Sequence, residues 1–133
     1  SKPLKQEELE NVLDKAFERI SRFHRELFTI RFGKNVVNLL CRDIVYLESN
    51  KRKVIVHTVR GEYEYYHKLD EAEEELLAIS ADFVRIHKAY LVNMEHVEAF
   101  QYEKLALRDG TILSISEAHR VNVRSRFWEW GSE

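Results

Sequence analysis

Residues 53–67 have the sequence KVIVHTVRGEYEYYH, in which β-branched and aromatic side chains dominate on both sides of one glycine. Such runs favour extended strands. The dipeptide Arg60-Gly61 supplies a glycine, which tolerates the positive φ of a tight connection. We therefore predict a β-hairpin with arms at 53–59 and 62–67, in a domain built mainly from strands.

Strand-like runs also lie on both sides of this hairpin. They occupy residues 28–32, 36–40, 44–48, 97–102, 104–108 and 111–115. A turn at 33–35 joins the first two, and Asp109-Gly110, the strongest short hairpin signal in the chain, joins the last two. Residues 83–86 form a further apolar run that approaches the core. The pattern favours antiparallel strands.

Helical periodicity is confined to three segments. Near the start of the chain, apolar residues spaced for one face of an amphipathic helix are Leu9, Val12, Leu13, Ala16, Phe17 and Ile20. The acidic segment 69–77 predicts a short helix. Its expected buried side carries Leu69, Ala72, Leu76 and Leu77. Residues 117–130 predict a closing helix. The expected fold class is mainly β, with short helices and an N-terminal amphipathic α-helix.

The composition sets limits on the protein class. A chain of 133 residues with 44% hydrophobic and 33% charged residues suits one folded domain and excludes a disordered tail. The absence of an apolar run of about 18 residues argues against a membrane span. Cys41 is the single cysteine, so no internal disulfide can form. We expect a reduced, cytoplasmic domain.

Signatures of catalysis or of metal and cofactor binding are missing from the sequence. None of the six histidines has another histidine three or four residues away, and glycine-rich phosphate loops are absent. His57 and His67, on the two arms of the central hairpin, are best interpreted as a cross-strand pair. The glutamates of 69–77 form a solvated helix face. We expect no enzyme, no metal and no cofactor.

The distribution of charge leaves nucleic-acid binding open. With 21 Lys and Arg against 23 Asp and Glu the net charge is −2, which excludes a uniformly basic binder but allows a basic patch. Positive charge is concentrated at 51–53 and at Arg120, Arg124 and Arg126. A basic trio such as 51–53 is usually a solvated turn.

Three blocks of sequence carry a family resemblance. They are DIVYLES at 43–49, FVRIHKAYLVN at 83–93 and LRDGTILSIS at 107–116. In this order and spacing they resemble the LytTR DNA-binding domain of bacterial response regulators. The resemblance implies an elongated, mostly antiparallel β fold over residues 27–133. It also implies loops that enter successive major grooves and bend the duplex, at sites that are paired direct repeats.

The resemblance also implies which residues contact DNA. The first loop corresponds to Asn50, Lys51, Arg52 and Lys53, the second contact position to Lys88, and the third to Ser116 and Glu117, with His119, Arg120 and Arg124 beyond. Family members often carry a basic residue where this chain has Glu117, which phosphates repel unless it accepts from a cytosine amine. His87 and Asn93 are expected to fix the turn, and Tyr46, Tyr90 and Leu91 to lie in the core.

The first residues suggest what precedes this domain. Ser1-Lys2-Pro3-Leu4 before the amphipathic helix resembles the end of a receiver domain, although any helix may have proline in its first turn. On this interpretation 1–26 is the receiver tail and linker. The same interpretation implies an upstream receiver domain, a sensor kinase, and homodimerisation of the full-length regulator.

The functional hypothesis is a sequence-specific DNA-binding output domain of a two-component transcriptional regulator. The alternative is a LytTR-like interaction or dimerisation module that does not bind DNA. The net charge of −2 and Glu117 support this alternative.

Overall fold

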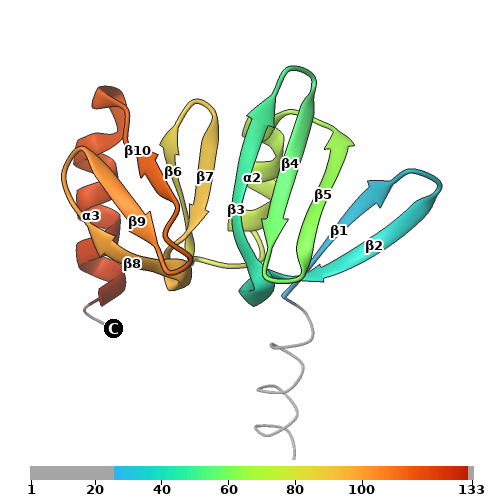
Figure 1. Cartoon of the computed structure of the whole chain (residues 1–133), viewed down its shortest axis with the longest axis horizontal. Coiled ribbons are helices and arrows are strands. Elements are labelled where there is room, and N and C mark those ends of the chain that lie inside the picture. The colour runs from blue at the N-terminus through green and yellow to red at the C-terminus, as the bar shows by residue number, and fades with distance from the viewer. Residues whose placement is uncertain (1–25, 132–133) are drawn as a thin grey trace, which may run out of the picture.

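The structure, a computed structural model, describes residues 26–131 (Figure 1). The predicted N-terminal helix and the receiver-tail assignment lie outside the described residues. The strands are β1 (Leu27–Phe32), β2 (Asn35–Leu40), β3 (Ile44–Asn50), β4 (Lys53–Thr58), β5 (Gly61–Tyr66), β6 (Phe83–His87), β7 (Tyr90–Asn93), β8 (Val97–Phe100), β9 (Lys104–Leu107) and β10 (Ile112–Ser114). The helices are α2 (Leu69–Leu77) and α3 (Arg120–Gly131), with 3-10 turns η1 (Cys41–Asp43), η2 (Met94–His96) and η3 (Glu117–His119).

Antiparallel pairing arranges the strands in three sheets. Their orders are β1-β2, β5-β4-β3-β7-β6 and β10-β9-β8. The β1–β2 hairpin lies at one end of the elongated molecule, and the three-stranded sheet with α3 lies at the other (Figure 1). The predicted antiparallel, mainly β class is confirmed. No helix within residues 26–131 is long and apolar enough to cross a membrane.

Strands β6 and β7 form a wall shared by two hydrophobic clusters. Phe83 and Leu91 pack in a cluster with α2 and the β1–β2 hairpin, whereas Val84, Ile86 and Val92 pack in a second cluster with the three-stranded sheet and α3. Successive side chains of a strand point to opposite faces, so both faces of this wall are apolar. The shared wall fixes the position of the turns at its ends.

The sequence pattern does not predict the pairing of β6 with β7. Its connection is Lys88-Ala89, which contains no glycine, and strands buried on both faces lack the alternation that marks a half-exposed strand. The register shifts between Arg85 and His87, so Ile86 is the extra residue of a β-bulge.

Two further details differ from the prediction. The β4–β5 turn is Val59-Arg60, and Gly61, at φ 142°, is the first residue of β5. The Thr58 hydroxyl closes this turn by donating to the Gly61 carbonyl at 2.8 Å. Leu77 is 39% exposed, because it lies about 100° around α2 from the buried Leu76.

Candidate nucleic-acid interface

Three connections lie along one edge of the molecule, at the top of Figure 1. We call this the turn edge: residues 50–53 between β3 and β4, residues 87–90 between β6 and β7, and residues 116–120 before α3. Backbone hydrogen bonds at or directly beside these segments connect them. The Ser49 amide donates to the Ala89 carbonyl at 2.8 Å, and the Ser116 amide donates to the Ile86 carbonyl at 2.9 Å.

The β3–β4 turn presents two unpaired cations. Lys51 takes positive φ, 61°, and the Arg52 carbonyl accepts from the His67 amide at 3.2 Å. Both side chains are exposed, as is that of Asn50, and neither cation has an ion pair within the described part of the chain. Lys53 differs because its ammonium lies 3.2 Å from Glu64. The Glu64 hydrogen bond raises the pKa of Lys53, whose charge is directed toward β5.

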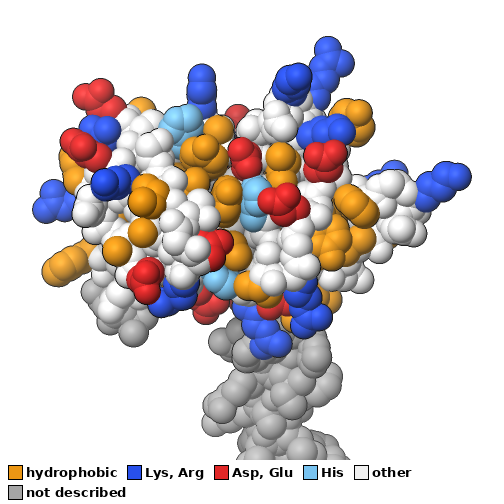
Figure 2. Space-filling model, in the orientation of Figure 1, with side chains coloured by type: hydrophobic (Ala, Val, Ile, Leu, Met, Phe, Trp, Pro, Cys, Tyr) orange, Lys and Arg blue, Asp and Glu red, His pale blue; other side chains and the backbone are white. Residues whose placement is uncertain are grey.

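A groove of about 740 Å³ runs between the first two turns. Lys51 and Arg52 line it from one turn and Lys88 from the other, so the structure brings these predicted residues together. Lys68, exposed just before α2, lines the same groove and was not identified from the sequence, because five acidic residues follow it within 69–77. Blue Lys and Arg side chains project beyond the tips of these hairpins in Figure 2.

Carboxylates also reach this groove. Asp70 and Glu71 of α2 line it, and Asp70 contacts Arg85 at 2.7 Å. Glu73, predicted to be solvated, is only 28% exposed and also contacts Arg85, at 2.8 Å. The acidic helix is therefore tied to β6 along one side.

The β6–β7 turn is closed by its own side chains. The Nδ1 atom of His87 accepts from the Ala89 amide at 3.0 Å, which confirms the predicted turn-fixing role. Burial lowers the pKa of His87, and the nearby charges of Lys88, His119 and Arg85 lower it further. Lys88 is exposed and has no ion pair with any residue in 26–131.

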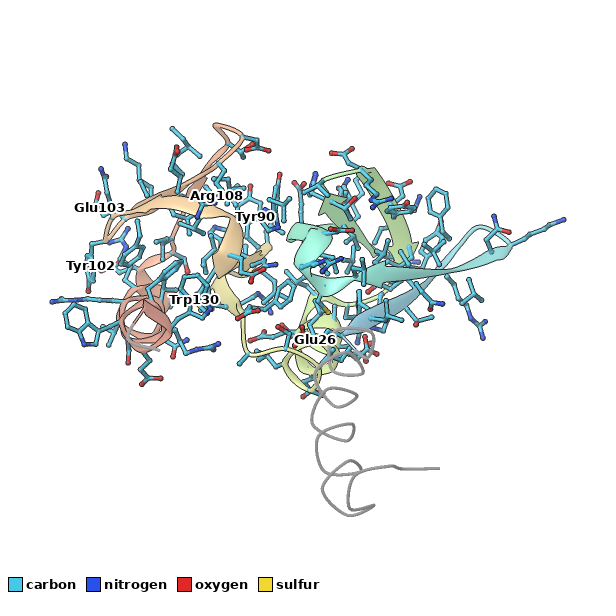
Figure 3. All side chains as sticks on the ribbon, turned by 90° about the horizontal axis from the view of Figure 1, so that it is seen from below. Glu26, Tyr90, Tyr102, Glu103, Arg108 and Trp130 are labelled. Carbon is cyan, nitrogen blue, oxygen red and sulfur yellow. The ribbon has the colours of Figure 1, made fainter. Side chains whose placement is uncertain are left out.

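Residues behind the turn are structural. Asn93 is 1% exposed; its Oδ1 accepts from the Glu95 amide, and its Nδ2 donates to the Cys41 and Ile44 carbonyls. Leu91 is fully buried. Tyr46 and Tyr90 are half-buried, in edge-to-face contact at 6.1 Å between centroids, and Figure 3 shows Tyr90 between the two halves of the molecule.

The third segment of the turn edge is held to the protein. The Ser116 hydroxyl lies 2.6 Å from Nδ1 of His119, and Arg120 donates from Nε to the Ile115 carbonyl at 3.1 Å. The Arg120 guanidinium lies 5.9 Å from the ring centroid of Tyr102, labelled in Figure 3. Glu117 and Arg124 are exposed. None of these residues lines the groove.

His57 and Cys41, two titratable residues away from the turn edge, have structural surroundings. His57 does not pair with His67: it lies opposite Glu62, stacks on Tyr46 at 4.1 Å, and its ring nitrogens contact Glu48 and Glu62. Burial raises the pKa of Cys41 to about 12, which keeps the thiol protonated. Residues 26–131 contain no group of three His, Cys, Asp or Glu placed to hold a metal ion.

Comparison with known protein families agrees with this fold. The model of the LytTr DNA-binding domain family matches residues 34–128. The chain belongs to this family. The LytTR domain is also similar to the sensory transduction protein LytT of Bacillus subtilis (strain 168), with 23% identity over 138 residues. That match covers 93% of this chain and 56% of the relative, so the chain spans little more than half of that protein's length.

A solved structure shows the same fold. A LytTr DNA-binding domain from Bacillus cereus superposes with a TM-score of 0.65 at 20% sequence identity. The superposition covers 77% of this chain and 96% of that one. The predicted LytTR resemblance is confirmed, and the family is one of DNA-binding domains.

Proposed function

We propose that this LytTR domain binds duplex DNA through the turn edge and acts as the sequence-specific output domain of a transcriptional regulator. The observation that carries the proposal is the convergence of Lys51, Arg52, Lys68 and Lys88 on one groove between neighbouring hairpin tips. These four cations make no ion pair within residues 26–131, so their charge is available to phosphates.

The turns are suited to groove entry because they project from a rigid sheet. A two-residue hairpin tip is narrower than a helix and fits a major groove about 12 Å wide. Arg52 can donate two hydrogen bonds to guanine O6 and N7, and Lys51 or Lys88 can contact guanine or a phosphate. Lys68 lies behind the tips, where a phosphate contact is its expected role.

The third segment contributes differently. Glu117 is exposed beside His119, and phosphates repel its carboxylate. Base contact at Glu117 therefore requires a cytosine amine, and backbone contact falls to Arg124, because Arg120 is engaged with Ile115 and Tyr102. Ser116 and His119 contact each other and act as a pair.

The wider architecture follows from the same proposal. Residues 27–133 are the DNA-binding domain and 1–26 the tail of an upstream receiver controlled by a sensor kinase. Two copies of the full-length regulator then occupy paired direct repeats. Such a role places the protein in the cytoplasm, where the chromosome is accessible.

One observation favours a second function, a protein-interaction or dimerisation module. Asp70 and Glu71 line the same groove as the cations, and Glu117 lies on the same edge. A mixed-charge groove can hold a protein segment carrying both signs.

Fluorescence anisotropy separates the two functions. The chain is titrated against a duplex from the regulator's own upstream region and against a shuffled duplex, at about 50 mM salt, where electrostatic attraction is strong. We expect tighter binding to the first duplex, and Lys88→Ala or Arg52→Ala should weaken it by roughly 1–3 kcal/mol.

Arg60→Ala is the matched control. It removes one cation from the β4–β5 turn, at the opposite end of the same sheet, where Arg60 is 79% exposed. This variant should bind like the wild type. Failure to bind either duplex would favour the interaction module, and equal losses in the Lys88 and Arg60 variants would reject the assigned surface.

A further inference from the structure

We infer that Arg85 is a positioning residue for DNA recognition, holding the β6–β7 turn so that Lys88 faces the groove. This inference rests on the proposed function, and it assigns Arg85 no contact with DNA. The side chain is only 12% exposed, and each of its three guanidinium nitrogens has a partner.

The guanidinium grips the turn through backbone carbonyls. Its Nε donates to the His87 carbonyl at 2.7 Å and its Nη2 donates to the Lys88 carbonyl at 2.6 Å. The guanidinium is planar and rigid, so two donors of fixed relative position hold two consecutive carbonyls in one orientation. The carbonyl carbon of Lys88 is bonded directly to its Cα, so these hydrogen bonds hold the main chain from which the Lys88 side chain projects.

The guanidinium contacts lie directly after a β-bulge. Ile86 is the extra residue in the β6–β7 ladder, and its carbonyl accepts from the Ser116 amide. A bulge disrupts the local ladder and leaves backbone groups that need other partners. Arg85 donates to the next two carbonyls, those of His87 and Lys88, and we expect these hydrogen bonds to stabilise a turn that contains no glycine.

Helix α2 anchors the other side of the guanidinium. Nη1 contacts Asp70 at 2.7 Å and Glu73 at 2.8 Å, which lie three residues apart and hence on one helix face. These carboxylates orient the planar group toward the turn. In return Arg85 offsets negative charge at the groove wall, where Asp70 would face incoming phosphates.

The test is a double-mutant cycle between positions 85 and 88, measured by anisotropy on the upstream duplex. Arg85→Lys keeps the charge but removes the fork that spans two carbonyls. We expect it to weaken binding by roughly three- to tenfold and to add almost nothing when Lys88 is already alanine, because Arg85 acts through Lys88. Hydrogen exchange at residues 87–90 should be faster in Arg85→Lys without DNA.

Arg126→Lys is the control. Arg126 also donates to two carbonyls, those of Ala81 and Phe83, at the opposite end of β6. This variant should lower thermal stability without changing affinity below the transition. Equal losses from Arg85→Lys in both position-88 backgrounds, or unchanged exchange at 87–90, would overturn the positioning role. Absence of duplex binding by the wild type would instead reject the proposed function.

Discussion

Replacing Asn93 by alanine should strongly lower the free energy of unfolding and leave duplex binding by the folded domain unchanged. Asn93 makes three hydrogen bonds, two buried ones to the carbonyls of Cys41 and Ile44 and a partly buried one from the amide of Glu95. It therefore links η1, before β3, to η2, after β7, across about fifty residues of chain.

The expected magnitude follows from these contacts. A buried hydrogen bond contributes about 1 kcal/mol net, and a partner left unsatisfied raises the penalty, so Asn93→Ala should cost about 3 kcal/mol. For a domain of this size that corresponds to a fall of about 12 °C in Tm. Urea denaturation and thermal circular dichroism measure the two quantities.

Asn93→Asp is the informative companion. The new carboxyl can still accept from the Glu95 amide, but it faces the Cys41 and Ile44 carbonyl oxygens and is buried, so its pKa should be raised. A raised pKa in the folded state means stability is present at low pH and lost as pH rises. The Asn93→Asp variant should therefore lose stability between pH 4 and pH 8 relative to Asn93→Ala.

Two results would refute this reasoning. Asn93→Ala within about 0.5 kcal/mol of the wild type would mean that the three bonds contribute little. Weaker duplex binding well below the transition, with the fold intact, would indicate that Asn93 serves recognition.

Three further predictions concern the turn edge. Replacing Lys51, Arg52 and Lys88 together by alanine should flatten the slope of log affinity against log salt by about 0.9 for each of the three that contacts a phosphate, at most about 2.7, and an unchanged slope would place the phosphate contacts elsewhere. Glu117→Lys should tighten binding and steepen that slope if phosphates pass the start of α3; weaker binding on the cognate duplex alone would indicate that Glu117 accepts from a base. Burial and neighbouring charge lower the pKa of His87, so the unfolded state binds its proton more readily and stability should rise with pH up to about 6.5. His87→Asn should reduce this dependence in urea titrations at several pH values, and an identical pH profile would assign it to another group.

The sequence predicted the fold best where the signal was local. Asp109-Gly110 and the glycine at position 33 mark turns that the structure contains, and both glycines have positive φ. The α2 bounds, 69–77, also agree, because Leu69, Ala72 and Leu76 form one buried face. The β4–β5 turn lies at residues 59–60, one residue before the predicted 60–61, and Thr58 closes it through a side-chain hydrogen bond.

Long-range contacts account for what was missed. Strands β6 and β7 are buried on both faces, so neither shows the alternation of a half-exposed strand. The sequence does not distinguish Arg85 from the other cations, because its partners Glu73 and Asp70 in α2 lie 12 and 15 residues away. The acidic run after Lys68 gives no indication in the sequence of a basic site, and only the structure shows that Lys68 lines the same groove as Lys88.

The wall formed by β6 and β7 has a mechanical consequence. Because each strand contributes side chains to both hydrophobic clusters, the two ends of the molecule cannot swing apart without exposing apolar surface on both sides. Within residues 26–131, the shared wall therefore opposes changes in the spacing of the hairpin tips. Under the proposed function, a duplex that spans these tips would supply the curvature itself, which favours operators with flexible pyrimidine–purine steps between the contacted segments.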